Sequence, residues 1–478
     1  MINPYALIYL VAHVIPAMIG FVALILYTHL LSAAEYGVYV VGASIAGIIS
    51  AVFFAWVRLS VARYQAKSPE LDLRVEAIVA YGGTVLVIAC LTPVALLIIR
   101  PNIGFGIVAG SLLLSLSLTA FEISQEFRRA QLNPLRYMTI GLTRGVLGLA
   151  FGYAAIELGG GGVGLLVGIG ASFLVANILS FQRNAAKPLR SFSIGYLKTF
   201  VRYGFPFLLG ALAFALHGAI DRLSVAYLLG PSAAGSYGLA ADLTRQIAAV
   251  LASSAASAVF PIAFRNLANA GASVTRARLA EGAELLLALI APVTIWLAIS
   301  ADVVAGTLLG SEFQTTVAAL LPVLALGRMC GAVNQYYLHV SFQLAEKPML
   351  QVVHDSSILI VNIALLFPLT VVFGLPGTAA AVLIAEALGI LIGIGLSRRA
   401  FKLPFNARGM ARVLASTLAV AGVTYAIKSA SSGQGFSALL SLAIAGVVSY
   451  AGAVLLFNVA GFRTMVVSFL GPRRLAAG

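Results

Sequence analysis

The sequence has few charged residues: Asp, Glu, Lys and Arg make up only 10% of its 478 residues. Soluble domains carry about 25% charged residues, so this scarcity excludes an ordinary soluble protein. Hydrophobic residues make up 61% of the chain, and its mean hydropathy is +1.01. The longest polar gaps, around 183–202 and 263–282, are too short to build a soluble domain. The composition therefore predicts an all-α polytopic membrane protein.

Cysteines and catalytic motifs are also scarce. The only two cysteines, Cys90 and Cys330, fall inside apolar runs, which excludes a disulfide framework. The five histidines are scattered over four spans without the i, i+4 spacing of helical metal ligands, so neither a metal nor a cofactor is expected. No Walker loop, zinc-protease motif or serine-hydrolase elbow occurs, which argues against an enzyme. The first apolar run has no basic stretch before it and predicts a retained span instead of a cleaved signal peptide.

Apolar runs long enough to cross a hydrocarbon core of about 30 Å recur along the whole chain. The fourteen predicted spans are 6–30, 38–57, 76–99, 104–125, 138–157, 162–181, 204–229, 236–262, 283–300, 316–342, 351–373, 376–397, 411–427 and 437–457. Glycine-rich joints at 159–162 and 374–377 separate the two most closely spaced pairs. An even number of spans places both termini on one side.

Basic residues are unevenly divided between the two sides of these spans. Of the 30 Lys and Arg residues, 24 fall on the side of the termini, two (Arg100 and Lys428) fall on the other side, and four lie within spans. The positive-inside rule therefore predicts cytoplasmic termini in a bacterial inner membrane. The net charge of +14 then reflects topology and contact with anionic membrane lipids, and no nucleic-acid partner is expected.

The chain also repeats itself at an offset of 198 residues. Leu30, Leu31, Gly37 and Tyr39 after the first span coincide with Leu228, Leu229, Gly235 and Tyr237 after the seventh. Equal orientation of the two copies predicts two six-helix lobes, 1–182 and 204–397, joined by a cytoplasmic linker at 183–203. Residues 398–478 add two further helices and a cytoplasmic tail. Parallel repeats of this kind place a substrate site between the lobes.

Charged side chains inside otherwise apolar spans are the candidate site residues. A charge at bilayer depth costs about 2.5–3.5 kcal/mol, so it faces a partner or a watery cavity. The hairpin from His217 to Arg245 carries four such groups at similar depth, which can pair across the hairpin or face a substrate: Asp221, Arg222, Asp242 and Arg245. Structural salt bridges and a substrate-facing role both fit this pattern.

Other charged residues form a second tier. Arg58 lies at the cytoplasmic end of its span, and Arg144 and Arg328 are placed about one to two turns from span ends, where each can snorkel. Glu386 lies about ten residues from either end of the twelfth span, as expected for a carboxylate that is protonated, paired or water-lined. Asp355 lies close enough to the cytoplasmic face to be an ordinary helix-entry residue.

The fourteen spans, the L-L-x-x-x-x-x-G-x-Y repeat and the Asp221-Arg222 pair on the seventh helix resemble the multidrug/oligosaccharidyl-lipid/polysaccharide (MOP) exporter superfamily, and within it the Wzx-type polysaccharide-biosynthesis branch. The resemblance implies two six-helix lobes around a central cavity. It also implies a flippase that moves an undecaprenyl-diphosphate-linked oligosaccharide to the periplasmic leaflet for exopolysaccharide synthesis. Many Wzx-type proteins have twelve spans, so the last two helices depart from that pattern.

The expected substrate is therefore a lipid-linked oligosaccharide, and a polysaccharide polymerase and glycosyltransferases are candidate partners. Because guanidinium groups suit phosphate, Arg222 and Arg245 are predicted to contact the diphosphate or acidic sugars, with Asp221 and Asp242 orienting them. The main alternative is a multidrug exporter of the same superfamily coupled to H⁺ or Na⁺, which would use Asp221, Asp242 and Glu386 to bind the cation. A third alternative is a membrane scaffold that recruits synthesis enzymes through the basic loop at 183–202.

Overall fold

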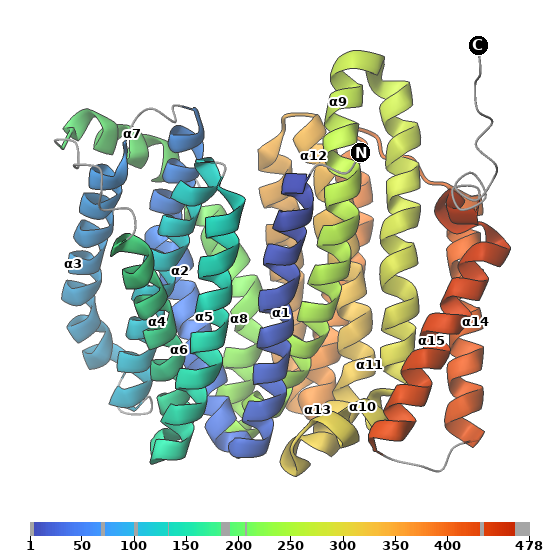
Figure 1. Ribbon diagram of the computed structural model, residues 1–478, viewed down its shortest axis with the longest axis horizontal. Helices are drawn as coiled ribbons and strands as arrows, with labels where there is room; N and C mark the ends of the chain where they lie inside the picture. The colour runs from blue at the N-terminus through green and yellow to red at the C-terminus, as the bar shows by residue number, and fades with distance from the viewer. Residues whose placement is uncertain are drawn as a thin grey trace. The chain divides into compact units, whose positions relative to one another are not determined.

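The computed structural model describes residues 4–67, 72–99, 104–131, 133–182, 192–205, 208–430 and 435–463. The α-helices are α1 (Pro4–Leu30), α2 (Ala33–Lys67), α3 (Arg74–Ile99), α4 (Phe105–Ala130), α5 (Pro134–Ala155), α6 (Gly161–Gln182), α7 (Ile194–Gly204), α8 (Leu208–Leu229), α9 (Pro231–Ile299), α10 (Ala301–Leu308), α11 (Ser311–Val333), α12 (His339–Leu344), α13 (Pro348–Ser397), α14 (Ala407–Ala430) and α15 (Phe436–Phe457). Short π-helical segments, Ile156–Gly160 and Asn334–Leu338, precede α6 and α12 (Figure 1). The described residues contain no strand, as the prediction of an all-α protein requires.

Eleven helices of the described chain are long and apolar enough to cross a membrane. Two of them, Pro134–Leu179 and Pro348–Ser397, each contain two predicted spans, joined at Gly159 and Gly374. Both glycines have left-handed backbone angles, φ 80° and φ 62°, which side chains with a Cβ rarely adopt. Each joint is therefore a tight turn, as predicted, and with α1 every one of the fourteen predicted spans lies on a helix.

Helices also run through the two segments that the sequence placed in loops. Helix α9 continues through 263–282 as a helical hairpin that breaks at Gly271, φ 83° (Figure 1). Helix α7 occupies the end of the predicted linker 183–203, of which 183–191 lie outside the described residues. Hydropathy detects bilayer-length apolar runs, so it missed helices whose exposed faces are polar.

The chain divides into two compact units, Met1–Gly238 and Leu239–Gly478. The division falls inside α9, and helix α8 contacts α2 within the first unit. The predicted lobe boundaries and the cavity between the lobes stay predictions.

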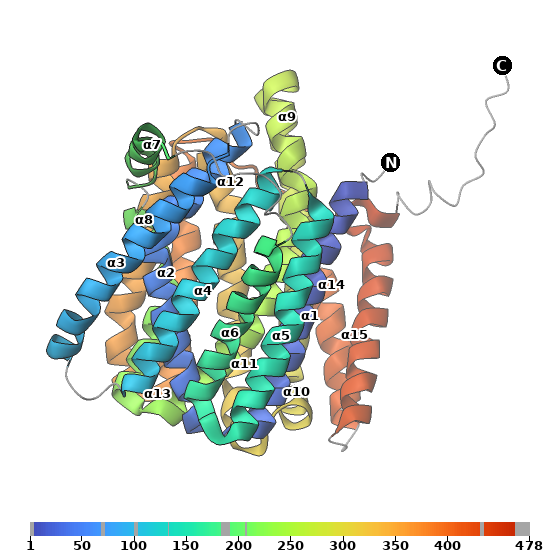
Figure 2. The same cartoon turned by 60° about the vertical axis from the view of Figure 1, so that its left-hand side comes forward.

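Helix α2 is the central helix of the first unit, in contact with α4, α6, α7 and α8. A capping box starts it: the Glu35 carboxylate accepts from the Ser32 N–H at 3.1 Å, and the Glu35 N–H donates to the Ser32 hydroxyl at 3.3 Å. Near its other end, the Ser60 hydroxyl donates to the Phe200 carbonyl of α7 at 3.0 Å. Figure 2 shows α4, α5 and α6 of this unit running alongside one another.

The repeated glycines explain the internal repeat of the sequence. A Cβ at Gly37 would lie 2.6 Å from the Pro231 carbonyl carbon, and a Cβ at Gly235 would lie 2.8 Å from the Gly37 nitrogen. Contacts this short are too close for real Cβ atoms, so the start of α2 and the start of α9 touch backbone to backbone. The two copies of the motif therefore pack on each other within the first unit.

Helices α14 and α15 contact each other and dock on the second half of α9 in the second unit. The Trp296 indole N–H donates to the Leu442 carbonyl at 2.9 Å, and the Tyr450 hydroxyl donates to the Ala288 carbonyl at 2.6 Å. The buried Glu284 carboxylate accepts from the Ala460 N–H at 2.8 Å, just beyond α15. These bonds fix α15 to α9, and the buried cluster of Ala288, Val413 and Val459 packs α14 against it.

Replacing Glu284 by alanine should loosen this C-terminal pair, because it removes the acceptor of a partly buried N–H. The expected loss is about 1–3 kcal/mol in the free energy of unfolding. Thermal unfolding in detergent and protease cleavage after α13 would measure it. Glu281→Ala is the matched control, since Glu281 is exposed and pairs only with Arg278 on the same helix. Equal melting of the two variants would contradict the assigned role of Glu284.

Candidate functional site

The charged hairpin predicted from the sequence is built by α8 and the start of α9. Asp221 is 2% exposed; its carboxylate accepts the Tyr237 hydroxyl at 2.8 Å and the Arg222 N–H at 3.0 Å. Tyr237, one of the repeated residues, is fully buried. The carboxylate of Asp221 is thus held by neutral donors of the first unit, and Arg222 beside it is 9% exposed.

Asp242 and Arg245 pair with each other along α9. The Arg245 guanidinium donates to the Asp242 carboxylate at 2.9 Å, three residues earlier on the same helix, and the Arg245 side chain is 62% exposed. Pairing with Asp221 or Arg222 across the hairpin, which the sequence left open, stays a prediction.

Arg58 is bound to a carboxylate. Its guanidinium donates to Glu122 of α4 at 2.6 Å, and both side chains are about one third exposed, 38% and 32%. Helix α2 continues nine residues beyond Arg58, to Lys67. Arg58 therefore joins α2 to α4, and its ability to snorkel from the end of the span stays a prediction.

Arg144 lies deeper than the sequence suggested. Helix α5 begins at Pro134, so Arg144 is ten residues into it, about 15 Å along the axis. Its guanidinium carbon sits 3.9 Å from the centroid of the Phe173 ring. Its Nε is buried with no hydrogen-bond partner among the described residues, and none of their carboxylates pairs with it. The placement near a helix end is corrected to one near the middle of α5.

Side chains from several helices pack around Arg144. Phe173 packs edge-on against Phe121, with ring centroids 5.3 Å apart. One turn after Arg144, the Gly148 carbonyl accepts from the buried Tyr27 hydroxyl of α1 at 2.9 Å. Helices α1, α4, α5 and α6 thus all contribute to the environment of this one guanidinium.

Arg328 holds a comparable position in the second unit. The apolar helix runs from Ser311 to Leu344, so Arg328 is 17 residues from its start and near its middle. Its Nε is buried without a hydrogen-bond partner in the part of the chain that the structure describes. The prediction that it lies one to two turns from a span end is therefore wrong.

Glu386 is held by an amide. It is 4% exposed, and Asn334 Nδ2 donates both to its carboxylate at 2.8 Å and to its backbone carbonyl at 2.9 Å. Asn334 begins the π-helical segment between α11 and α12. Gly331 leaves room for the carboxylate, since a Cβ there would lie 2.9 Å from Glu386 Oε1. A buried carboxylate with a neutral donor is able to take up a proton or a cation.

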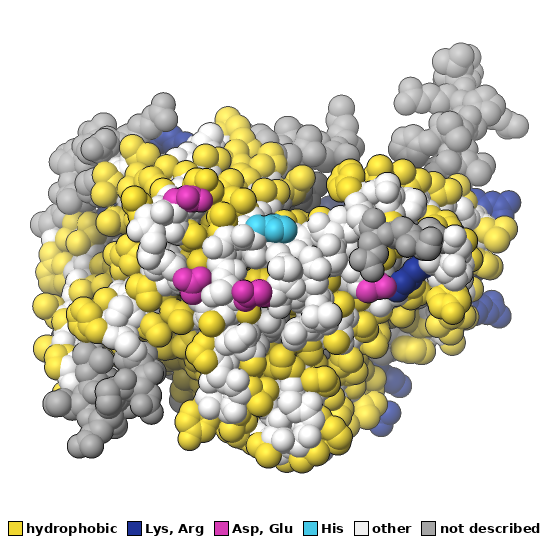
Figure 3. Space-filling model, turned by 90° about the horizontal axis from the view of Figure 1, so that it is seen from below, with side chains coloured by type: hydrophobic (Ala, Val, Ile, Leu, Met, Phe, Trp, Pro, Cys, Tyr) yellow, Lys and Arg dark blue, Asp and Glu magenta, His cyan; other side chains and the backbone are white. Residues whose placement is uncertain are grey.

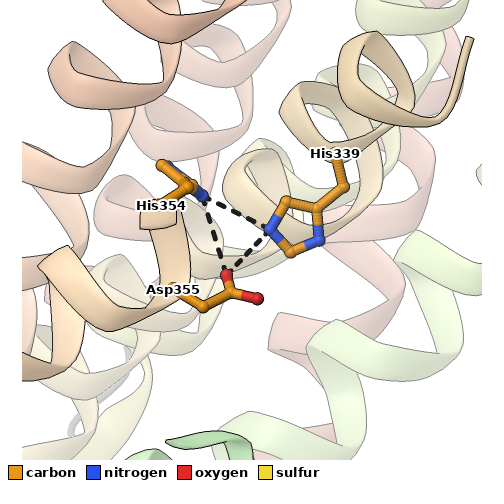
Figure 4. A group of neighbouring side chains, drawn as sticks. All are labelled: His339, His354 and Asp355. Carbon is orange, nitrogen blue, oxygen red and sulfur yellow. Dashed lines mark hydrogen bonds and ion pairs between the residues drawn. The ribbon is translucent and has the colours of Figure 1, made fainter. Parts of the chain in front are cut away.

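Sequence reasoning missed a group of three ligand-type side chains. His339, His354 and Asp355 offer ring nitrogens and a carboxylate oxygen that lie within 4.8 Å of one another (Figure 4). His339 and His354 come from different spans, so local spacing carried no signal for their contact. Asp355 was expected to be an ordinary helix-entry residue. Its carboxylate oxygen Oδ1 lies at hydrogen-bond distance, 2.9 Å, from His339 Nε2.

Figure 3 shows a few acidic side chains, separate from one another, among mostly hydrophobic ones in the view from below. Asp302 lies in α10, a short helix that connects two longer apolar helices. Its carboxylate lies 2.6 Å from the Lys428 ammonium. Partial burial would raise the pKa of Asp302, but the hydrogen bond from Lys428 and the Val303 N–H together lower it below its ordinary value. The sequence places Arg100 with Lys428 on the side opposite the termini, but Arg100 lies outside the described residues.

The sequence profile described as "Polysaccharide biosynthesis protein" matches residues 5–267, more than half of the chain. A search of curated proteins finds no match.

Solved structures match the fold over nearly the whole chain. A structure titled "Lipid II flippase MurJ, inward closed conformation" matches with a TM-score of 0.77 at 14% identity, covering 96% of this chain and all of the other. An inward-facing multidrug resistance MATE family transporter of the MOP superfamily matches at 0.64 and 14% identity, covering 82% of this chain and 97% of the other. A Vibrio cholerae MATE transporter matches at 0.55 and 15% identity, covering 83% and 95%. These likenesses confirm the predicted polytopic, all-α fold.

Proposed function

This chain belongs to the polysaccharide biosynthesis protein family, and we propose that it is a flippase for a polyprenyl-diphosphate-linked oligosaccharide. One structure of similar fold is titled a lipid II flippase and others are titled multidrug transporters, so the fold suits more than one cargo. The observation that carries the proposal is the state of Arg144 and Arg328, mid-helix arginines that pair with no carboxylate among the described residues.

Anionic cargo accounts for these arginines better than cationic cargo does. A guanidinium inside a membrane helix is costly unless something compensates its charge. Arg58 and Arg245 are compensated by Glu122 and Asp242. Arg144 and Arg328 have no such carboxylate in the described chain, so a negatively charged substrate group is the partner that fits them.

The geometry at Arg144 suits a diphosphate. The guanidinium carbon lies over the Phe173 ring at 3.9 Å from its centroid, and a guanidinium carries its N–H donors along its edges. Those edges present donors in the planar fork that binds two phosphate oxygens at once. We propose that Arg144 contacts the diphosphate in the first unit and that Arg328 does so in the second, while Arg222 and Arg245 remain candidates. The polyprenyl tail stays in lipid throughout.

The proposed topology comes from the charge distribution of the sequence, and the proposed direction of transport is the one that the resemblance to Wzx-type flippases implies. With 24 basic residues on the side of the termini against two on the other, we place the termini in the cytoplasm and the protein in the inner membrane. Transport then runs from the cytoplasmic to the periplasmic leaflet by alternating access. Assembly of the polymer on the far side makes a polymerase and glycosyltransferases the expected partners.

A multidrug exporter coupled to H⁺ or Na⁺ is the second candidate. The observation that favours it is Glu386, buried and held by the neutral donor Asn334. Asp221, buried against Tyr237, is a comparable carboxylate in the first unit. A flippase could use the same carboxylates for ion coupling. Their presence is therefore compatible with both functions, and only the transported cargo distinguishes them.

Accumulation of lipid-linked saccharide in a deletion strain tests the proposal. We expect intermediates to remain accessible only from the cytoplasmic leaflet, and the wild-type gene to restore their export. The same strain is tested for sensitivity to cationic drugs. Normal saccharide export together with increased drug sensitivity would overturn the flippase and favour the multidrug exporter.

A further inference from the structure

We infer that His339, His354 and Asp355 form a binding site for a divalent transition-metal ion of the zinc class. His339 Nε2 lies 2.9 Å from Asp355 Oδ1 and 3.3 Å from His354 Nδ1, and His354 Nδ1 lies 3.7 Å from the same carboxylate oxygen. The three atoms converge on one point between the side chains (Figure 4). The site lies within the second unit and does not depend on the proposed transport function.

These distances match the edges of a tetrahedral zinc site. Ligand atoms about 2.0–2.1 Å from zinc in tetrahedral geometry are about 3.3–3.4 Å apart. The observed separations, 2.9, 3.3 and 3.7 Å, bracket that value, so small side-chain rotations suffice to admit the ion. Two imidazoles and one carboxylate are a donor set that suits zinc and its neighbours and does not suit calcium or magnesium, which prefer oxygen.

A backbone hydrogen bond orients the His354 ring so that the lone pair on Nδ1 faces His339 and Asp355. His354 Nε2 lies 2.9 Å from the Gly389 carbonyl, which accepts only if Nε2 carries the proton. Nδ1 of the neutral ring is then the acceptor, and it faces His339 and Asp355. A histidine that donates its second N–H to a backbone carbonyl is the usual arrangement of a metal ligand. Gly393 permits it, because a Cβ there would lie 2.8 Å from Nε2.

Two further features place and open the site. The π-helical segment Asn334–Leu338 ends immediately before His339 and shifts the following residues around the helix axis relative to a regular α-helix. His339 and His354 are 7% and 0% exposed, whereas the Asp355 side chain is 32% exposed. An ion can therefore reach the site past Asp355, and water can fill the fourth position.

A hydrogen-bonded cluster without a metal is the competing explanation, and it predicts different behaviour. In that case His339 donates to Asp355 and the cluster binds no ion at micromolar zinc. In the site proposed here, the ion replaces that hydrogen bond and joins α12 to the first turns of α13. Metal stoichiometry and cobalt absorption separate the two cases without any measurement of transport.

The test uses the full-length protein in detergent, purified with a tag that contains no histidine and stripped of metal with a chelator. We expect gel-filtered protein loaded with Zn²⁺ to retain one equivalent by elemental analysis. Co²⁺ should give the visible absorption of a tetrahedral site, and Zn²⁺ should raise the unfolding temperature. His339→Gln and Asp355→Asn should weaken zinc binding by about 10- to 100-fold or more. His29→Gln, in the last turn of α1, is the matched control and should bind as the wild type does.

Two results would overturn the site. The first is no retained zinc in the wild-type protein. The second is equal binding by the wild type, His339→Gln and Asp355→Asn, which would place the ion elsewhere. Since His339 is buried, its variant can fail to fold; Asp355→Asn, on a partly exposed side chain, then decides the outcome.

Discussion

Gly37→Ala is expected to destabilise the first unit strongly, whereas Gly47→Ala on the same helix is expected to leave it intact. The new methyl group at residue 37 would overlap the Pro231 carbonyl, and a backbone group cannot swing aside as a side chain can. Gly235→Ala should act in the same way, because its Cβ would overlap the Ala33 carbonyl. At Gly47, nothing lies within 4 Å of the added Cβ.

The magnitudes separate the test from its control. Overpacking by one methyl group costs about 1–3 kcal/mol and more where the contact is with backbone, out of a total stability of about 5–15 kcal/mol. At Gly47, alanine should instead stabilise the helix by about 0.5–1 kcal/mol. Size-exclusion profiles of detergent-solubilised protein after heating would measure both. Should Gly37→Ala survive heating as well as Gly47→Ala does, the close approach of the two helix starts is not needed for folding.

The apolar spans were predictable because the membrane imposes their length. Each of the fourteen predicted runs lies on a helix, and even the glycine joints at 159–162 and 374–377 are turns. Helix ends were less predictable. Helix α5 begins four residues before its predicted span and α2 ends ten residues after its own, because polar residues extend a helix beyond the apolar run. That extension changed the depths assigned to Arg58 and Arg144.

The partners of the charged residues were not predictable from the sequence. Arg58 pairs with Glu122, and Asn334 with Glu386, across sequence separations of 64 and 52 residues. Local spacing carries no information about such contacts, which depend on how helices pack. The same limit concealed the approach of His339 to His354, 15 residues apart but on different helices. The sequence therefore predicted which charged residues lie within the apolar helices, but it did not predict which side chains they contact.

This difference reorders the candidate arginines. The sequence ranked Arg222 and Arg245 first because they lie at similar depth in the charged hairpin, each with an aspartate to orient it. In the structure, that aspartate counts against Arg245, whose charge is already matched by Asp242 on its own helix. Arg144 and Arg328, ranked second, are mid-helix arginines without a carboxylate partner among the described residues. The site residues remain predictions, and Arg144 offers the sharper test.

Arg144→Ala is expected to reduce export of the lipid-linked saccharide by about 10- to 100-fold, because a hydrogen bond to a charged group is worth about 1.5–3 kcal/mol. Arg144→Lys should give an intermediate rate, since lysine keeps the charge but loses the planar fork and the stacking on Phe173. Arg136→Ala, at the exposed first turn of the same helix, is the matched control and should export normally. Leaflet-specific labelling of the saccharide in the complemented deletion strain would measure all three rates.

A structural role for Arg144 predicts a different pattern. If the guanidinium served only to pack against Phe173, Arg144→Ala would lower the unfolding temperature and the amount of protein in the membrane, and export per molecule would be unchanged. The flippase proposal requires the opposite: normal insertion and melting, with a lower rate per molecule. Wild-type export per molecule by Arg144→Ala would therefore remove Arg144 from the cargo path. The buried Nε would then need a partner other than the diphosphate.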